Sequence, residues 1–334
     1  MGRHYRSIIH IGLPKTATTL FQERLFKKAA ERHYIGPGAY KKCYSQAKRI
    51  FSAETFENQD IESLKDLFIT DKPIFFSDEA IGNGTKVPRI EKYNRVSSLI
   101  PNAKWVITLR NPLDMLESIY LWDIHSLKRT RRHFRSLERW FDSRWGAYTS
   151  GNHKCNVSPV DGGQIAKELT IYAGRDDVDV LLFEDFIYRK EQYVAQFSSY
   201  LGIETDLSLQ YLGDTIRNRR LTRDGYSFLS CFAKSNDYAS VLISLEFKEW
   251  RDAQESCFEE KVSIILEKYL SGQQEAGNCF FEIFDFVNSN GVDLPRNLIH
   301  DFPLIYEAVR EITDAGFCWV KNEFGLDLDK YEYF

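Results

Sequence analysis

Short apolar runs rich in β-branched residues alternate along the chain with longer segments whose apolar residues recur at helical spacing. Four runs have the length of buried strands, at residues 7–11, 73–77, 104–109 and 178–183. Helical patterns lie between and after these runs, at residues 19–32, 61–68, 90–100 and 113–141. Strands that alternate with helices predict a largely parallel sheet covered on both faces. We therefore expect an α/β protein of three layers, with a central parallel sheet flanked by helices.

Beyond about residue 226 the strand-like runs stop, and two long helical patterns follow at residues 247–269 and 304–324. This change predicts an α/β domain at 1–225 and a C-terminal helical region at 226–334 that packs on it. Residues 147–163 are rich in turn formers, which indicates a loop or a flexible lid.

Composition narrows the class of protein further. Hydrophobic residues make up 43% of the chain and charged residues 28%, which is typical of a globular protein. The net charge is −4, so any attraction for anions must be local. The six cysteines form no CxxC pair, and the sequence has no His cluster at zinc spacing, so we expect free thiols and no metal. No run approaches a membrane span and few residues precede the first strand, which predicts a soluble cytoplasmic protein without a signal peptide.

The first predicted strand runs directly into a segment with the layout of a phosphate loop. Gly12 ends the strand, LPKTATT follows at residues 13–19, and a helical pattern then begins. Such a layout points backbone N–H groups at a phosphate. Against the Walker pattern G-x-x-x-x-G-K-[ST], Ala17 replaces the second Gly and Thr18 replaces the Lys, while Lys15 lies inside the loop. The loop therefore predicts a P-loop-like fold with a phosphate site different from that of an ATPase.

Polar residues also follow the other three strands, where ligands bind in parallel sheets. They are Asp78-Glu79, Arg110-Asn111-Pro112 and Glu184-Asp185. Pro112 suits the first turn of a helix, and Ser118 follows eight residues after Arg110. A guanidinium fork and a hydroxyl that reach the same point suit a phosphate.

With both elements in view, the chain resembles sulfotransferases that use 3′-phosphoadenosine 5′-phosphosulfate (PAPS). Residues 14–19 resemble the family's 5′-phosphosulfate loop, and residues 110–120 resemble its 3′-phosphate element. Residues 180–186, with 200–203 behind them, are similar to a late strand and helix of bacterial and carbohydrate sulfotransferases. The resemblance covers most of residues 1–215, and it departs from the family pattern at Ala17, where Gly is usual.

The resemblance implies a role for each matched residue. Lys15 neutralises the charge that builds on the leaving group. Arg110 and Ser118 bind the 3′-phosphate, and a later basic loop contributes a further contact. The 5′-phosphate is held by the loop residues Pro14, Lys15, Thr16, Ala17, Thr18 and Thr19, and the basic-loop candidates are Arg217, Arg219 and Arg220. The family transfers a sulfuryl group in line, needs no metal and releases adenosine 3′,5′-bisphosphate (PAP).

In-line transfer to a hydroxyl requires a base. Glu79 is the candidate, because carbohydrate sulfotransferases commonly use a Glu. Asp78 could serve instead, and His125 is the next alternative. His10 lies within the first strand, which favours a structural histidine of the core.

The expected function is sulfuryl transfer from PAPS to a hydroxyl, most readily that of a saccharide or glycan. The alternative is a P-loop ATPase or kinase in which Asp78-Glu79 forms a Walker B-like element. A non-catalytic binding protein is disfavoured by the presence of Lys15, Arg110 and a strand-end carboxylate. Nucleic acid is not an expected partner, because no recognised binding motif accompanies the basic clusters.

Overall fold

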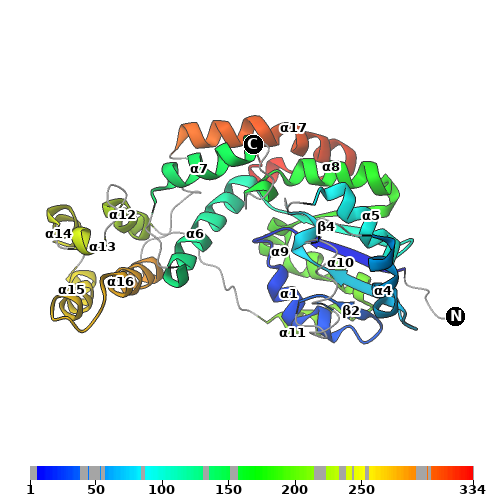
Figure 1. Cartoon of the computed structure of the whole chain (residues 1–334), viewed down its shortest axis with the longest axis horizontal. Coiled ribbons are helices and arrows are strands. Elements are labelled where there is room, and N and C mark those ends of the chain that lie inside the picture. The colour runs from blue at the N-terminus through cyan, green and yellow to red at the C-terminus, as the bar shows by residue number, and fades with distance from the viewer. Residues whose placement is uncertain are drawn as a thin grey trace. The chain divides into compact units, whose positions relative to one another are not determined.

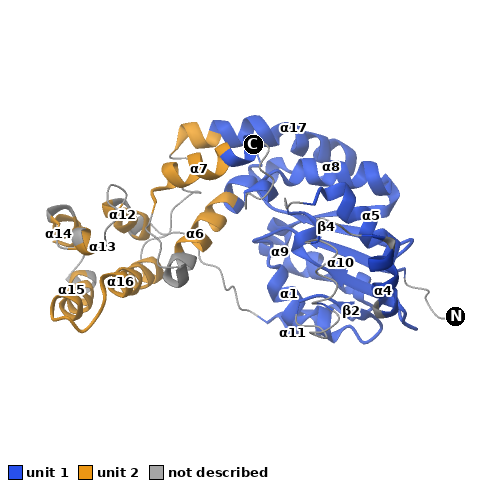
Figure 2. Ribbon diagram, viewed as in Figure 1, with its two compact units in different colours: residues 1–115, 147–215, 307–334 blue, residues 116–146, 216–306 orange. Residues whose placement is uncertain are grey.

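The computed structural model describes residues 6–37, 44, 53, 57–83, 87–130, 135–150, 157–213, 223–232, 238–242, 244–252, 256–290, 299 and 302–333. The chain divides into two compact units, each assembled from separate segments (Figure 2). The first unit comprises residues 1–115, 147–215 and 307–334, and the second comprises 116–146 and 216–306. The two contiguous domains expected from the sequence, 1–225 and 226–334, stay a prediction.

The first unit contains a five-stranded sheet in the order β2-β3-β1-β4-β5, and every neighbouring pair is parallel (Figure 1). The strands are β1 (Ile8–Gly12), β2 (His33–Ile35), β3 (Ile74–Ser77), β4 (Lys104–Leu109) and β5 (Val178–Leu182). Four of them lie within one residue of their predicted bounds. No pattern in the sequence predicted β2, which has only three residues and pairs with β3 alone at the edge of the sheet.

Helices cover both faces of this sheet, which confirms the α/β fold of three layers. On one face, α1 (Thr18–Arg24), α10 (Lys190–Leu201) and α11 (Thr205–Leu212) enclose a core cluster that includes Phe21, Phe75 and Phe197. On the other face, α5 (Arg89–Leu99) and α8 (Gly162–Ala173) pack near Trp105 of β4. α4 (Asn58–Phe68) places Phe68 against the ring of Phe76 on this second face.

His10 links three adjacent strands inside the first core. Its Nδ1 is 3.0 Å from Oγ of Ser77 on β3, and its Nε2 is 3.3 Å from Oγ1 of Thr108 on β4. Burial lowers the pKa of His10 to about 3, so the ring is neutral at ordinary pH. His10 therefore has the structural role that its place in the first strand predicted.

Three predicted helices differ from the observed ones. The segment expected at 19–32 ends its α-helix at Arg24 and continues as the 3₁₀ turn η1 (Phe26–Lys28). The segment expected at 113–141 forms α6 (Pro112–Thr130) and α7 (Leu137–Thr149). The segment expected at 247–269 forms α14 (Leu245–Asp252) and α15 (Ser256–Leu270). The pattern at 304–324 matches α17 (Pro303–Phe324).

Eight further elements complete the described part of the chain. They are η2 (Glu79–Ile81), η3 (Ser158–Val160), η4 (Arg175–Asp177), α9 (Phe183–Tyr188), α12 (Arg223–Phe232), α13 (Tyr238–Leu242), α16 (Ala276–Asn290) and η6 (Asp329–Tyr331). The expected lid at 147–163 thus contains the end of α7, η3 and the start of α8, while 151–156 lie outside the described residues. No described helix is long and apolar enough to span a membrane.

The second unit is helical where it is described, and aromatic side chains form its core. Phe228 of α12 contacts the rings of Phe232, Phe247, Phe280 and Phe284. These residues come from α12, α14 and α16, so the cluster holds three separate helices together.

In the first unit, α8 and α17 approach each other through two glycines. A Cβ added to Gly163 of α8 would lie 2.4 Å from the carbonyl carbon of Gly316 on α17, and a Cβ on Gly316 would lie 2.6 Å from the main-chain nitrogen of Gln164. Main-chain atoms cannot yield as the end of a side chain can, so this crossing requires small residues.

We predict that Gly163→Ala destabilises the protein by about 2 kcal/mol or more, because the added methyl overpacks the crossing. Gly146→Ala on α7 is the matched control, since its Cβ meets nothing within 4 Å. We expect Gly146→Ala to be neutral or to stabilise by up to about 1 kcal/mol. Urea unfolding followed by circular dichroism measures both changes, and equal stabilities of the two variants would contradict the described crossing.

Candidate active site

The loop between β1 and α1 has an unusual backbone that suits an anion. Lys15 has φ 68° and Ala17 has φ 57°, whereas Thr16 between them is not in the positive-φ region. Backbones whose φ alternates in sign turn successive N–H groups toward one point and form an anion-binding nest. The loop therefore keeps the left-handed conformation at Ala17 although the residue is not glycine.

Side-chain packing inside the loop fixes this backbone. The buried hydroxyl of Thr16 donates to the main-chain oxygen of Leu13 at 2.6 Å and lies 3.1 Å from the hydroxyl of Thr18. Residue 12 must be glycine, because a Cβ there would lie 2.2 Å from Oγ1 of Thr18. Thr19 is exposed at the first turn of α1. Both Thr16 and Thr18 thus stabilise the loop from within.

Arg110 at the tip of β4 contacts this loop directly. Its Nη1 donates to the main-chain oxygen of Lys15 at 2.7 Å, and its guanidinium lies 5.0 Å from the ring centroid of Phe183. Arg110 is only 8% exposed. The two sequence elements that predicted phosphate binding are therefore brought together.

The structure does not test the other residues expected to contact the 3′-phosphate. Ser118 is half-buried on α6, in the part of that helix that belongs to the second unit. Arg217, Arg219 and Arg220 lie outside the described residues, as does the side chain of His125. Their roles stay predictions.

Glu79 and Asp78 follow β3 and have different environments. Asp78 is buried and accepts hydrogen bonds with both carboxylate oxygens, from the Ala80 N–H and from the Tyr44 hydroxyl, each at 2.7 Å. Glu79 begins η2 and is half-buried. Burial and the charge of Asp78 raise the pKa of Glu79 to about 7, while the cation of Lys15 opposes the shift. The carboxyl of Glu79 thus lies near Lys15 with a pKa close to neutral pH.

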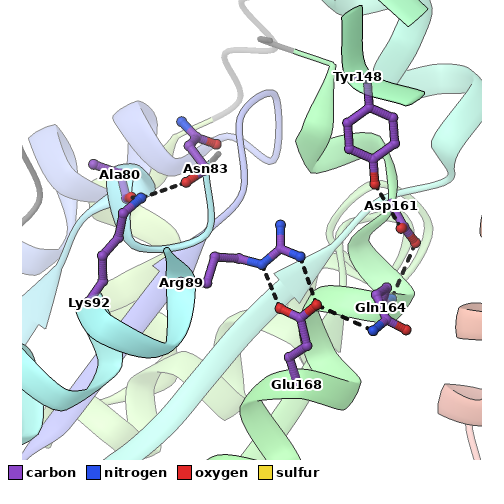
Figure 3. A network of polar contacts seen from close by, with 8 residues as sticks. All are labelled: Ala80, Asn83, Arg89, Lys92, Tyr148, Asp161, Gln164 and Glu168. Carbon is purple, nitrogen blue, oxygen red and sulfur yellow. Dashed lines mark hydrogen bonds and ion pairs between the residues drawn. The ribbon is translucent and has the colours of Figure 1, made fainter. Parts of the chain in front are cut away.

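A buried lysine that no sequence pattern indicated holds the Glu79 turn in place (Figure 3). Nζ of Lys92 on α5 donates to the main-chain oxygens of Ala80 at 2.7 Å and Asn83 at 2.6 Å. Burial, and then the charge of Arg89, lower the pKa of Lys92 to about 7. A lysine on an amphipathic helix resembles any surface lysine in sequence, so only the fold reveals this contact.

Beside this turn, a polar network connects α5, α7 and α8 (Figure 3). Arg89 forms a bidentate ion pair with Glu168, with Nε···Oε2 at 2.6 Å and Nη2···Oε1 at 2.8 Å. Asp161 accepts from the Tyr148 hydroxyl at 3.0 Å and from the Gln164 N–H at 3.4 Å, which caps α8. The network fixes the helices that lie next to η2. Across the part of the chain that the structure describes, no group of three or more His, Cys, Asp or Glu side chains is placed to hold a metal ion.

Comparisons with known proteins identify similar solved structures. No protein-family model matches the chain, and no curated protein matches it. A sulfotransferase from Alicyclobacillus acidocaldarius is 17% identical, with a TM-score of 0.44, over 75% of this chain and 100% of that one. Mouse sulfotransferase SULT7A1 complexed with PAP is 10% identical, with a TM-score of 0.37, over 83% and 88%. A sulfotransferase domain of the Synechococcus olefin synthase is also 10% identical, with a TM-score of 0.37, over 88% and 98%.

We predict that Ala17→Gly stabilises the protein by about 1 kcal/mol, because glycine adopts the left-handed region without the Cβ strain of alanine. Ala195→Gly in the interior of α10 is the matched control, and it should destabilise by about 1 kcal/mol. The measurement is the urea midpoint of each variant. A loss of stability in Ala17→Gly equal to that of the control would show that Ala17 is not left-handed in solution.

Proposed function

We propose that this chain is a PAPS-dependent sulfotransferase that transfers a sulfuryl group to a hydroxyl of an acceptor, a saccharide or glycan. The observation that carries the proposal is the hydrogen bond from Arg110 to the Lys15 carbonyl, which joins two anion-binding elements next to Glu79. Two such elements that meet at one edge of the sheet suit a nucleotide with phosphates at both its 5′ and 3′ positions.

The residues present fit this nucleotide. The nest at residues 14–19 suits the 5′-phosphate, and the fork of Arg110 suits the 3′-phosphate, to which Ser118, Arg217 and Arg219 are proposed to add contacts. PAPS supplies the sulfuryl group, and PAP is the group released. Lys15 neutralises the negative charge that builds on the leaving phosphate oxygen. Because every cation in this scheme is a side chain, the proposed reaction uses no metal.

Glu79 is proposed as the general base that takes the proton of the acceptor hydroxyl. A base is most effective when its pKa lies near the working pH, and the pKa of Glu79 is about 7. Asp78 is a poorer candidate, because Tyr44 and the Ala80 N–H occupy its oxygens. Oxygens that already accept these hydrogen bonds are also less able to bind magnesium, so Asp78 is a poor Walker B-like ligand. This argues against the ATPase or kinase alternative. The proposal also keeps the cytoplasmic location expected from the sequence.

We expect PAP, in the presence of a chelator, to stabilise the protein against heat, by about 2.7 kcal/mol at a concentration one hundred times its Kd. ATP with magnesium should give a much smaller shift, because the loop lacks the Walker Lys-Ser/Thr pair. Differential scanning fluorimetry measures both. Stabilisation by ATP with magnesium and none by PAP would overturn the proposal in favour of a nucleoside triphosphatase.

Turnover should depend on Lys15 and Glu79 in different ways. Lys15→Ala should lower PAP release from PAPS, measured with a panel of saccharide acceptors, by about 10²- to 10³-fold. Lys72→Ala, at an exposed lysine before β3, is the control and should leave the rate unchanged. Unchanged turnover in Lys15→Ala would remove Lys15 from the mechanism.

The pH profile tests Glu79 separately. The base acts as a carboxylate, so wild-type kcat should rise with pH through about 7 and then level off. Glu79→Gln should lower kcat by about 10²- to 10⁴-fold and abolish the rise of kcat with pH near 7, while PAP still binds. Glu62→Gln, at an exposed residue of α4, is the control. A Glu79→Gln enzyme that retains both the wild-type kcat and its rise with pH would show that another group is the base.

A further inference from the structure

The C-terminal segment of the chain contacts the turn that carries Arg110. The hydroxyl of Tyr333 donates to Oε2 of Glu184 at 2.6 Å, and both residues are buried. The other oxygen of Glu184, Oε1, accepts the main-chain N–H of Asn111 at 2.8 Å. Glu184 therefore connects the end of the chain to the residue that follows Arg110.

The side chain of Asn111 makes further hydrogen bonds that hold the same turn. Its Oδ1 accepts the Leu113 N–H at 2.9 Å and caps the start of α6, with Pro112 in the first helical position. Its Nδ2 donates to the main-chain oxygens of Tyr331 at 3.1 Å and Glu332 at 2.9 Å. The turn after β4 is thus held from both sides, by Glu184 after β5 and by the C-terminal segment.

Charge and packing support the same connection. Burial raises the pKa of Glu184, while the Tyr333 hydroxyl, the Asn111 N–H and the Arg110 cation oppose the shift. The ring of Tyr333 packs edge-on against Phe317 of α17, with centroids 5.0 Å apart. The ring of Tyr333 is therefore held against α17, and a buried, hydrogen-bonded carboxyl group is costly to leave without its partners.

We propose that Tyr333 and Glu184 are positioning residues for Arg110, so that the C-terminal segment determines the selectivity of this site for a nucleotide that bears a 3′-phosphate. This inference rests on the proposed function, in which Arg110 binds the 3′-phosphate. Tyr333 and Glu184 act through the Asn111 turn and need not touch the nucleotide. Their loss should weaken recognition of the 3′-phosphate selectively and leave recognition of the 5′-phosphate intact.

The test compares the dissociation constants of PAP and adenosine 5′-monophosphate (AMP), which differ only in the 3′-phosphate, by isothermal titration calorimetry. The wild-type protein should bind PAP much more tightly, and Arg110→Ala should lower the PAP-to-AMP affinity ratio by about a hundredfold. Tyr333→Phe should lower the same ratio by about tenfold, with little change in AMP affinity.

The matched control is Tyr200→Phe. The Tyr200 hydroxyl donates to Oδ2 of Asp179 at 2.6 Å, so the control removes the same kind of bond near the opposite end of β5. It should leave the ratio unchanged. Glu184→Ala should lower the ratio as Tyr333→Phe does, whereas Glu184→Gln should retain most of it, because a glutamine keeps an acceptor for the Asn111 N–H and a partner for Tyr333.

The outcomes separate the two proposals. A wild-type protein that does not distinguish PAP from AMP, or an Arg110→Ala variant with an unchanged ratio, would overturn the assignment of Arg110 under the proposed function. If Arg110→Ala behaves as expected but Tyr333→Phe and Glu184→Ala keep the wild-type ratio, the positioning role is wrong, even where thermal stability falls. If Tyr333→Phe does not fold, the Glu184→Ala and Glu184→Gln pair decides.

Discussion

The proposed site depends on one hydrogen bond, from the guanidinium of Arg110 to the main-chain oxygen of Lys15. β1 and β4 are neighbours in the parallel sheet, so the loop after one strand and the turn after the other emerge side by side. The bond then fixes the distance between them. A charged donor on a carbonyl, largely shielded from water, is among the stronger hydrogen bonds in proteins. It joins two short motifs, distant in sequence, into one surface, which we propose binds a doubly phosphorylated nucleotide.

Opposed electrostatic effects set the pKa of Glu79, which lies near this bond. Burial and Asp78 favour the neutral form of Glu79, whereas Lys15 favours its carboxylate, and the resulting pKa is about 7. This balance requires the turn after β3 to stay fixed, and Lys92 holds it through two main-chain oxygens. The amine of Lys92 is buried beneath the turn, and Lys15 is the cation on the side of the proposed leaving group.

The sequence predicted most of the elements that form the sheet, because buried parallel strands are continuous apolar runs that few other segments imitate. It also predicted which residues follow those strands, and hence the meeting of Lys15 with Arg110. It did not predict β2, which is too short to produce a pattern, or the division of 113–141 into two helices. Lys92 and Tyr333 were missed for a different reason. Their partners are main-chain oxygens or residues far away in the sequence, and no local pattern encodes such contacts.

The most direct test of the central claim is a crystal structure of the protein with PAP bound. We expect the 5′-phosphate within hydrogen-bond distance of the main-chain N–H groups of residues 14–19, and the 3′-phosphate in contact with the guanidinium of Arg110. We also expect that the Arg110 bond to the Lys15 carbonyl persists and that Glu79 faces the open side of the 5′-phosphate. A nucleotide bound elsewhere, or one whose 3′-phosphate points away from Arg110, would contradict it.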